Sequence, residues 1–166
     1  RRMRRPYTAT RYAVLLERLR TALPGVAITT DVIAGFPGEA EAEFAESRDF
    51  VAAMGFARLH VFPFSPRPGT VAAALPDPVP PPVRRERTEI LSALARSSEA
   101  EFRRRHLGER LEVLWERPRA GTSQGLTGNY LRVFLRSGGS DGSGQRNTFS
   151  QVRAVALAPE GLWGEA

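Results

Sequence analysis

The stretch "ITTDVIAGFPGEAEAEF", residues 28–44, joins an apolar, β-branched run to a glycine-proline turn and an acidic amphipathic segment. The run 26–34 is almost continuously apolar, which predicts a strand that is buried on both faces. The segment 39–54 has the spacing of an amphipathic helix, and "ARLHVFPF" at 57–64 predicts a second strand. Together these segments predict a βαβ unit, in which the two strands are parallel and adjacent.

Outward from this unit, the sequence predicts a helix at 8–23, capped by Thr8 or Thr10, and a longer helix at 83–106. The proline-rich segment 65–82 is too stiff for a helix and is expected to form an extended strap. The arginines of the longer helix are expected to lie opposite its apolar side. The apolar residues expected to face the core are Tyr12, Leu15, Leu16, Leu19, Leu23, Phe44, Val51, Met54, Ile90, Leu91, Leu94 and Phe102.

From residue 107 the pattern changes to the alternation of β-strands. The segments "ERLEVLWER", "NYLRVFLR" and "TFSQVRAVAL" alternate in this way, and turns rich in Gly, Ser and Asn separate them. We therefore divide the chain into residues 1–106 and a small β domain at 107–166, of barrel or sandwich size. A single βαβ unit cannot close a core, so the first part is expected to be the late portion of a larger α/β barrel and the chain a C-terminal fragment.

Composition limits the classes of function. The chain has no cysteine, which excludes disulfides, thiolate metal sites and a cysteine nucleophile within it and fits a cytosolic protein. No apolar run approaches the ~18 residues of a membrane span. The net charge of +6 is carried by arginine alone, with seven arginines against one glutamate in residues 1–20 and seven against four in residues 84–105. Such density predicts an RNA or DNA partner, with a solvated helix face as the alternative for the second cluster.

The turn after the first strand has the residue types of a ligand site. In α/β folds, ligands bind beyond the carboxyl ends of the parallel strands, where residues 35–39 and 65–70 both fall. Glycine lets a ligand approach the backbone closely, and a helix N-terminus favours an anion. The alternative is a tight connection in which Glu39 is a first-turn helix acid.

Asp31, His60 and Ser65 also lie near the ends of these strands and suggest a hydrolytic triad. However, Ser65 lacks the nucleophile-elbow motif, and His60 is expected to pack or hydrogen-bond inside the barrel. A metal site is less expected still, because the only histidines are His60 and His106.

Four segments in order resemble the radical S-adenosylmethionine methylthiotransferases: "MRRPYTATRY" (3–12), "AITTDVIAGFPGEAEAEF" (27–44), "LHVFPFSPRPGTVAA" (59–73) and "RRERTEIL" (84–91). The β domain, with "LEVLWER" and "GLTGNYLRV", resembles the TRAM domain that ends those enzymes. "LHVFPFSPRPGT" is most similar to the MtaB-type branch, which acts on threonylcarbamoyladenosine in tRNA. The isopentenyladenosine and ribosomal-protein branches, of MiaB and RimO type, are close relatives.

The resemblance implies an α/β plus β fold, the C-terminal portion of a radical SAM partial (β/α) barrel followed by a small TRAM-like β-barrel. It implies a cytoplasmic transferase that adds a methylthio group to adenosine 37, next to the tRNA anticodon, by means of S-adenosylmethionine and 4Fe-4S clusters. Because the chain has no cysteine, the cluster ligands are expected in a missing N-terminal part of the same enzyme, and this chain alone is expected to be inactive. A non-catalytic RNA-binding module is the alternative.

The resemblance places no catalytic or metal-binding residue in this chain. It implies a cofactor face in which Ile33 contacts the adenine, made of Arg5, Tyr7, Asp31, Ile33, Gly35, Phe36, Pro37, Gly38, Glu39, Phe62, Phe64 and Ser65. Tyr130 occupies the family's Asn-Tyr position and is expected either to stack on a base or to fill the barrel core. The candidate RNA contacts are Arg67, Arg117, Arg119, Asn129, Tyr130 and Arg132.

Overall fold

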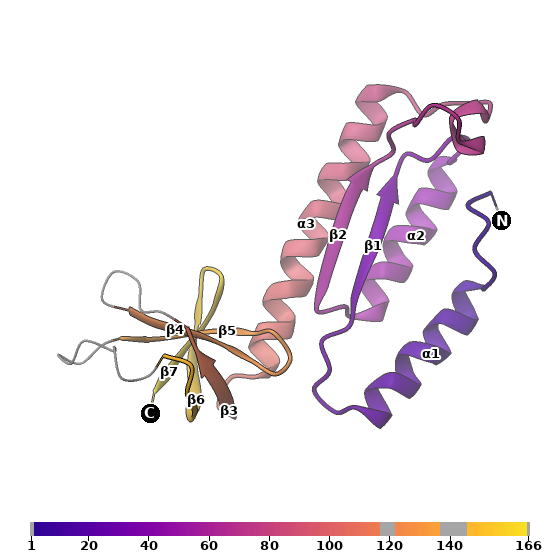
Figure 1. Ribbon diagram of the computed structural model, residues 1–166. Helices are drawn as coiled ribbons and strands as arrows, with labels where there is room; N and C mark the ends of the chain where they lie inside the picture. Colours follow the sequence, from indigo (N-terminus) through magenta and orange to yellow (C-terminus); the bar gives the residue numbers. More distant parts are fainter. Residues whose placement is uncertain (1, 117–121, 137–145, 166) are drawn as a thin grey trace. The chain divides into compact units, whose positions relative to one another are not determined.

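The computed structural model describes residues 2–116, 122–136 and 146–165 (Figure 1). The chain divides into two compact units, residues 1–99 and 100–166, and each is described by itself. The division falls inside the last helix of the first unit, seven residues before the end of the segment 1–106 that the sequence suggests.

The first unit contains the βαβ arrangement that the sequence predicts. Strand β1 (Thr29–Ala34) and strand β2 (Arg58–Pro63) form a two-stranded parallel sheet, and helix α2 (Glu41–Met54) connects them (Figure 1). Helix α1 (Ala9–Ala22) precedes β1, and Thr8 caps it by accepting a hydrogen bond from Arg11 N. Helix α3 (Pro81–Arg105) follows β2, and its residues up to 99 belong to this unit.

One face of the sheet carries the core of the first unit. Val32 and Val61 pack there against Phe44 of α2 and Leu91 of α3. Leu16 of α1 joins the adjoining cluster, which is centred on Val51, Phe56 and Leu59. All three helices therefore bury their apolar sides on the same face of the sheet.

The prediction that the first strand is buried on both faces is wrong. Residues alternate along β1 between partly buried and exposed, and only Ala34 at its end is fully buried. The physical reason is that the sheet has only two strands, so the helices cover one face and leave the other open. The apolar and β-branched residues of this run are typical of a strand buried on both faces. In the described residues, however, the helices pack against one face only.

Three smaller expectations also fail. Leu15 and Leu23 of α1 are about half exposed, and Ile90 of α3 points away from the core. The proline-rich segment contains a short 3-10 helix, η1 (Val71–Ala74), which Thr70 caps by accepting a hydrogen bond from Ala73 N. The segment is therefore not extended throughout. A 3-10 helix can be as short as these four residues, so it fits into a part of the segment that contains no proline.

The second unit is a closed five-stranded barrel with the strand order β3-β4-β5-β7-β6. Three of its strands were predicted, and two, the glycine-containing β4 and β7, were not. The strands are β3 (Arg110–Trp115), β4 (Thr122–Thr127), β5 (Arg132–Arg136), β6 (Phe149–Ala158) and β7 (Gly161–Glu165).

Side chains fill the interior of this barrel. Val113, Trp115, Val133 and Val152 form its central cluster and are almost fully buried. The indole Nε1 of Trp115 donates a hydrogen bond of 2.7 Å to Ser150 Oγ, which satisfies the buried N–H group. The described strands of the barrel therefore enclose a packed core of side chains.

None of the helices in the described segments has the length and hydropathy that crossing a bilayer requires. The same residues contain no group of three or more His, Cys, Asp or Glu side chains that could hold a metal ion.

Candidate functional site

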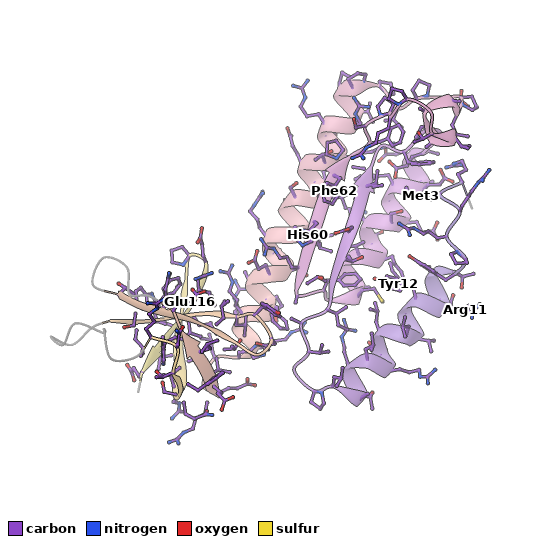
Figure 2. The ribbon with its side chains drawn as sticks, viewed as in Figure 1. Met3, Arg11, Tyr12, His60, Phe62 and Glu116 are labelled. Carbon is purple, nitrogen blue, oxygen red and sulfur yellow. The ribbon has the colours of Figure 1, made fainter. Side chains whose placement is uncertain are left out.

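The uncovered face of the β1–β2 sheet, which we call the open face, gathers residues from both strands. Asp31 is the register partner of His60, and Ile33 is the register partner of Phe62. Alternation along the strands places these four residues on the same side, and all four are exposed. Figure 2 shows two of them, His60 and Phe62, on β2. The open face therefore has a polar pair followed by an apolar pair at the carboxyl end of the strands.

The turn after β1 is buried within the chain. Gly35, Phe36 and Pro37 are all buried, in contrast to Ile33 just before them. Gly35 adopts a φ of 74°, a left-handed conformation that favours glycine, and a Cβ built on it would lie 2.7 Å from Arg84 Cγ. Close packing against α3 therefore explains this glycine without a ligand, which differs from the reason that the sequence suggested.

The backbone of Gly38 forms hydrogen bonds with two segments that are distant in sequence, the proline-rich segment and the N-terminal segment. Its N–H donates a hydrogen bond of 2.7 Å to the carbonyl of Asp77 in the proline-rich segment. Its carbonyl accepts one of 3.0 Å from Arg2, whose guanidinium also pairs with Glu43 at 2.6 Å. Part of the N-terminal arginine cluster therefore has an acidic partner, which local sequence did not reveal.

Glu39 lies before α2 and inside the turn, so it is not a residue of the first turn of the helix. Its Oε2 accepts hydrogen bonds of 2.9 Å from Gly35 N and from Arg87 Nη1. Arg87 also donates to the carbonyl of Glu39 at 2.8 Å and pairs with Glu41 at 2.9 Å. Its side chain is only 6% exposed, although the sequence predicted that the arginines of this helix lie opposite the core.

Burial alone would lower the pKa of Arg87, but hydrogen bonds with Glu41 and Glu39 and their negative charges outweigh it, and the pKa is raised. The guanidinium carbon also lies 5.0 Å from the centroid of the Phe44 ring. Sequence reasoning missed Arg87 because its partners are 46 and 48 residues away along the chain.

The exit of β2 lies beside the same turn. Phe64 N donates a hydrogen bond of 2.8 Å to the carbonyl of Ala34, and the rings of Phe36 and Phe64 meet edge to face at 5.3 Å. Ser65 and Arg67, which follow, are exposed. The two strand exits that the sequence suggested as a ligand mouth are thus adjacent.

In the N-terminal segment, Arg5 and Tyr7 are exposed. The Tyr7 ring lies 5.4 Å from the ring of Tyr12, which packs against the core of the first unit. Figure 2 shows Tyr12 on α1, with Met3 in the segment before the helix. The predicted cofactor residues therefore separate into exposed side chains, such as Asp31, and turn residues that are buried.

The suggested hydrolytic triad is only partly assembled. Asp31 and His60 are neighbours across the strands, and His60 is exposed and not packed in an interior as expected. No hydrogen bond joins Asp31, His60 and Ser65 in the part of the chain that the structure describes. The arrangement gives no support to Ser65 as an activated nucleophile.

In the barrel, Tyr130 follows β4 in a tight turn and is 84% exposed, so it does not fill the core. Thr127 closes the turn, because its hydroxyl accepts a hydrogen bond of 2.9 Å from Leu131 N. The amide nitrogen of Asn129 lies 3.2 Å from His106 Nε2, and His106 Nδ1 lies 3.0 Å from the carbonyl of Phe102. These contacts fit a neutral imidazole that donates through Nδ1, so Asn129 holds the turn that exposes Tyr130.

The other candidate RNA contacts are less informative. Arg132 pairs with Glu116 at 3.0 Å on the barrel surface. Arg117 and Arg119 lie outside the described residues.

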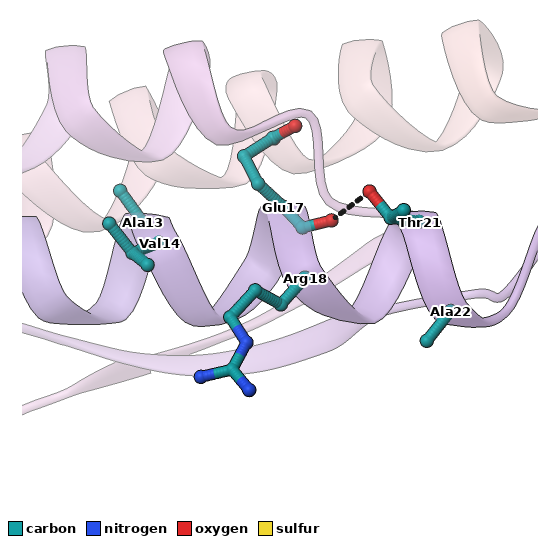
Figure 3. A pocket seen from close by; sticks show the side chains of 6 residues that line it. All are labelled: Ala13, Val14, Glu17, Arg18, Thr21 and Ala22. Atoms are coloured by element: carbon teal, nitrogen blue, oxygen red, sulfur yellow. Dashed lines mark hydrogen bonds between the residues drawn. The ribbon is translucent and has the colours of Figure 1, made fainter.

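A shallow, open depression also lies along α1 and is lined by Ala13, Val14, Glu17, Arg18, Thr21 and Ala22 (Figure 3). A single helix forms it, and apart from Arg18 of the N-terminal arginine cluster it contains none of the candidate cofactor or RNA contacts. Thr21 Oγ1 donates a hydrogen bond of 2.9 Å to the carbonyl of Glu17 within it. The depression therefore has few polar groups free to hold a ligand.

Comparison with known proteins gives tRNA methylthiotransferases among the relatives, whereas no family model matches the chain. The threonylcarbamoyladenosine tRNA methylthiotransferase MtaB of Bacillus subtilis is 42% identical over 140 residues, which are 81% of this chain and 31% of that protein. A tRNA-2-methylthio-N(6)-dimethylallyladenosine synthase of Chloroflexus aurantiacus is 41% identical over 167 residues, 98% of this chain and 35% of that protein. The MtaB protein of Thermotoga maritima is 33% identical over 162 residues, 97% of this chain and 36% of that protein.

The chain thus spans about a third of the length of the curated relatives it matches. The resemblance that the sequence motifs carried is confirmed by identities at this level across most of the chain. This similarity covers both the α/β unit and the closed β-barrel. The chain is therefore homologous to part of the tRNA methylthiotransferases, and its relatives include enzymes named for both threonylcarbamoyladenosine and dimethylallyladenosine.

Proposed function

We propose that this chain is the C-terminal part of a radical S-adenosylmethionine tRNA methylthiotransferase and that its open face holds the adenosyl group of the cofactor. The observation that carries the proposal is the pair Ile33 and Phe62, 39% and 50% exposed, at the carboxyl end of two parallel strands. Exposed apolar side chains at that end offer a flat surface to a nucleobase, and Asp31 beside them offers an acceptor to hydroxyl groups.

The residues present fit S-adenosylmethionine but do not fit an iron–sulfur cluster. An apolar pair, a neighbouring carboxylate and the exposed hydroxyl of Ser65 suit the adenosyl group, whereas a chain without cysteine supplies no thiolate ligand. In such enzymes the cofactor supplies the radical chemistry, and the residues of this chain would bind and orient it. We therefore propose that the cluster ligands lie outside residues 1–166 and that these residues alone do not cleave the cofactor.

The roles of the predicted cofactor residues differ under this proposal. Asp31, Ile33, Phe62 and Ser65 would contact the ligand, because they are exposed on or next to the open face. The turn residues would instead hold the end of β1 in place without contacting the ligand, because their groups bond within the chain or are buried. These residues are Gly35, Phe36, Pro37, Gly38 and Glu39. Arg5, Tyr7 and Phe64 would make further contacts with the ligand at the edge of the open face.

For the second part of the protein, residues 107–166, we propose a TRAM-like domain that binds the anticodon loop of tRNA. Tyr130 supports this role, because an exposed aromatic ring on a fixed turn is suited to stacking on a base. Within this domain Arg132 would add a contact with a phosphate group. Arg67 belongs to the first unit and is a separate candidate for such a contact. This function would place the protein in the cytoplasm, where tRNA is found.

Within the family we propose the branch that acts on threonylcarbamoyladenosine. The segment 59–70 supports this choice by its resemblance to that branch, and two of the relatives are named for that substrate. Dimethylallyladenosine is the alternative, because other relatives at similar identity are named for it. Expression of a gene that contains this segment in cells that lack the modification would decide, since mass spectrometry distinguishes the two methylthio nucleosides.

Titration of the full chain with S-adenosylmethionine by calorimetry tests the cofactor proposal. Phe62→Ser and Ile33→Ser should each weaken binding, because each removes apolar contact area from the open face. Leu15→Ser is the matched control, since Leu15 is 49% exposed on α1 and lies away from this face. Equal affinity in all four proteins would show that the open face does not hold the ligand.

The same chain can be tested as a non-catalytic RNA-binding module. Binding of an anticodon stem-loop with no measurable affinity for S-adenosylmethionine would favour that alternative. Binding of both ligands would support the proposed enzyme part. Affinity for RNA should fall with added salt, because phosphate contacts release counterions.

A further inference from the structure

Arg87 is the most deeply buried charged residue among the described residues, and each of its contacts leads to the turn after β1 or to the start of α2. It is 5% exposed, and its guanidinium reaches Glu39 through both the carboxylate and the carbonyl. Its second terminal nitrogen pairs with Glu41, which is 80% exposed. A buried arginine with this many fixed bonds holds its partners in one arrangement.

Glu39 connects Arg87 by hydrogen bonds to the residue that follows β1, Gly35. The same oxygen atom of Glu39, Oε2, accepts from Arg87 Nη1 and from Gly35 N, both at 2.9 Å. Gly35 directly follows Ala34, whose carbonyl accepts the 2.8 Å hydrogen bond from Phe64 N at the exit of β2. One carboxylate thus links α3 to the point where both strand ends meet.

Neither Arg87 nor Glu39 lies on the open face. Arg87 packs with its guanidinium carbon 5.0 Å from the Phe44 ring, on the side of the sheet that the helices cover. Ile33, two residues before Gly35, faces the other side and is exposed. The network therefore acts on the open face only through the backbone of β1 and its turn.

We infer that Arg87 is a positioning residue, which fixes the turn at Gly35 through Glu39 and thereby sets the ligand-facing end of β1. The inference rests on the proposed function for its consequence, which is the affinity for an adenosyl ligand. Its structural part, the ordering of Gly35 by Arg87, does not depend on any ligand. The two parts therefore have separate measurements.

Glu41 provides an internal contrast. Arg87 uses Nη1 for Glu39 and Nη2 for Glu41, but only Glu39 contacts Gly35. If Arg87 acted merely by its charge pairing, the loss of either carboxylate should have similar effects on the turn. If it acts through the turn, Glu39→Ala should disturb Gly35 and Glu41→Ala should leave it unchanged.

The experiment uses the full chain labelled with ¹⁵N, and measures amide hydrogen exchange at Gly35 together with the affinity for S-adenosylmethionine. Arg87→Met removes the charge but retains similar apolar bulk, and Arg87→Lys restores a charge that can bond fewer partners. Arg85→Met is the matched control, because Arg85 is exposed on the same helix. Unfolding curves establish which variants are folded under the conditions of the assay.

The expected result is exchange at Gly35 that is faster by about thirtyfold in Arg87→Met and in Glu39→Ala, with no change in Glu41→Ala or Arg85→Met. Affinity for S-adenosylmethionine should fall about tenfold in the same two variants, with partial recovery in Arg87→Lys. Should Arg87→Met not fold, Arg87→Lys and Glu39→Ala provide the same comparison.

The outcomes separate the two ideas. Binding by the wild-type chain that is equal in Arg87→Met, with unchanged exchange at Gly35, would overturn the inference and leave the proposed function standing. Absence of binding by the wild-type chain, with faster exchange at Gly35 in Arg87→Met, would support the ordering by Arg87 and refute the proposed cofactor face. Unchanged exchange at Gly35 in every folded variant overturns the inference, whatever the ligand does.

Discussion

Ile33 and Phe62 are register partners on two parallel strands, and both side chains remain exposed, 39% and 50% respectively. Side chains of this type at the carboxyl end of a parallel sheet are usually covered by neighbouring elements or by a ligand. The pair distinguishes the open face from the rest of the unit, where apolar residues of the strands pack against the helices. Four measurable predictions concern the open face, the turn after β1, the exposed Tyr130 and the carboxylate of Glu43.

The first concerns the stability of the open face. Phe62→Ser should change the free energy of unfolding of the chain by less than about 1 kcal/mol, because the residue is already 50% exposed to water. Phe44→Ala, on the covered side, should lower it by about 3–5 kcal/mol, because that ring is 2% exposed. Urea denaturation followed by circular dichroism measures both values. Similar losses for the two variants would mean that Phe62 is covered in solution.

The second prediction concerns the turn after β1. Gly35→Ala should destabilise the chain by about 1–3 kcal/mol, because alanine is strained at a φ of 74° and its Cβ would lie against Arg84. Gly69→Ala is the matched control, since Gly69 has a φ of 81° with nothing within 4 Å of the added Cβ. The difference between the two losses, measured by thermal or urea unfolding, isolates the contact with Arg84. No difference would show that α3 does not pack on the turn.

The third prediction concerns Tyr130. Tyr130→Ala should weaken the binding of an anticodon stem-loop by about 1–3 kcal/mol, as expected for the loss of one stacked base, while Tyr130→Phe should retain most of the affinity. Phe149→Ala is a control for a second exposed ring, 66% exposed on β6. Fluorescence anisotropy of a labelled stem-loop measures each affinity. An equal loss in Phe149→Ala would assign the effect to general apolar contact with the barrel.

The fourth prediction concerns pH. The hydrogen bond from the backbone of Ala40, and then the one from Arg2, lower the pKa of Glu43 below 4.5. Because the folded-state pKa lies below the unfolded one, Glu43 stabilises the fold above pH 4.5, and this contribution is lost as the pH falls through the lowered pKa. Wild-type stability should therefore fall more steeply with acid than that of Glu43→Gln. Parallel curves for the two proteins in urea unfolding would contradict the lowered pKa of Glu43.

The sequence by itself determined the order and the type of most elements. Alternation and helical spacing are local properties, so the βαβ unit, the two flanking helices and three barrel strands followed from residues that are near one another in the chain. Strands β4 and β7 were missed because each contains glycine, which weakens the local signal of a strand. The motifs also carried the family, which the identities with known relatives confirm.

Only the tertiary structure decided which side chains are buried and which remain free. The apolar run of β1 could not show that one face has no cover, and the arginine spacing of α3 could not show that Arg87 is buried among Glu39, Glu41 and Phe44. Burial and ion pairing depend on partners that folding brings together from positions some 40 to 50 residues away. Local pattern therefore fixes the elements, whereas long-range packing fixes the environment, and hence the role, of each residue in the site.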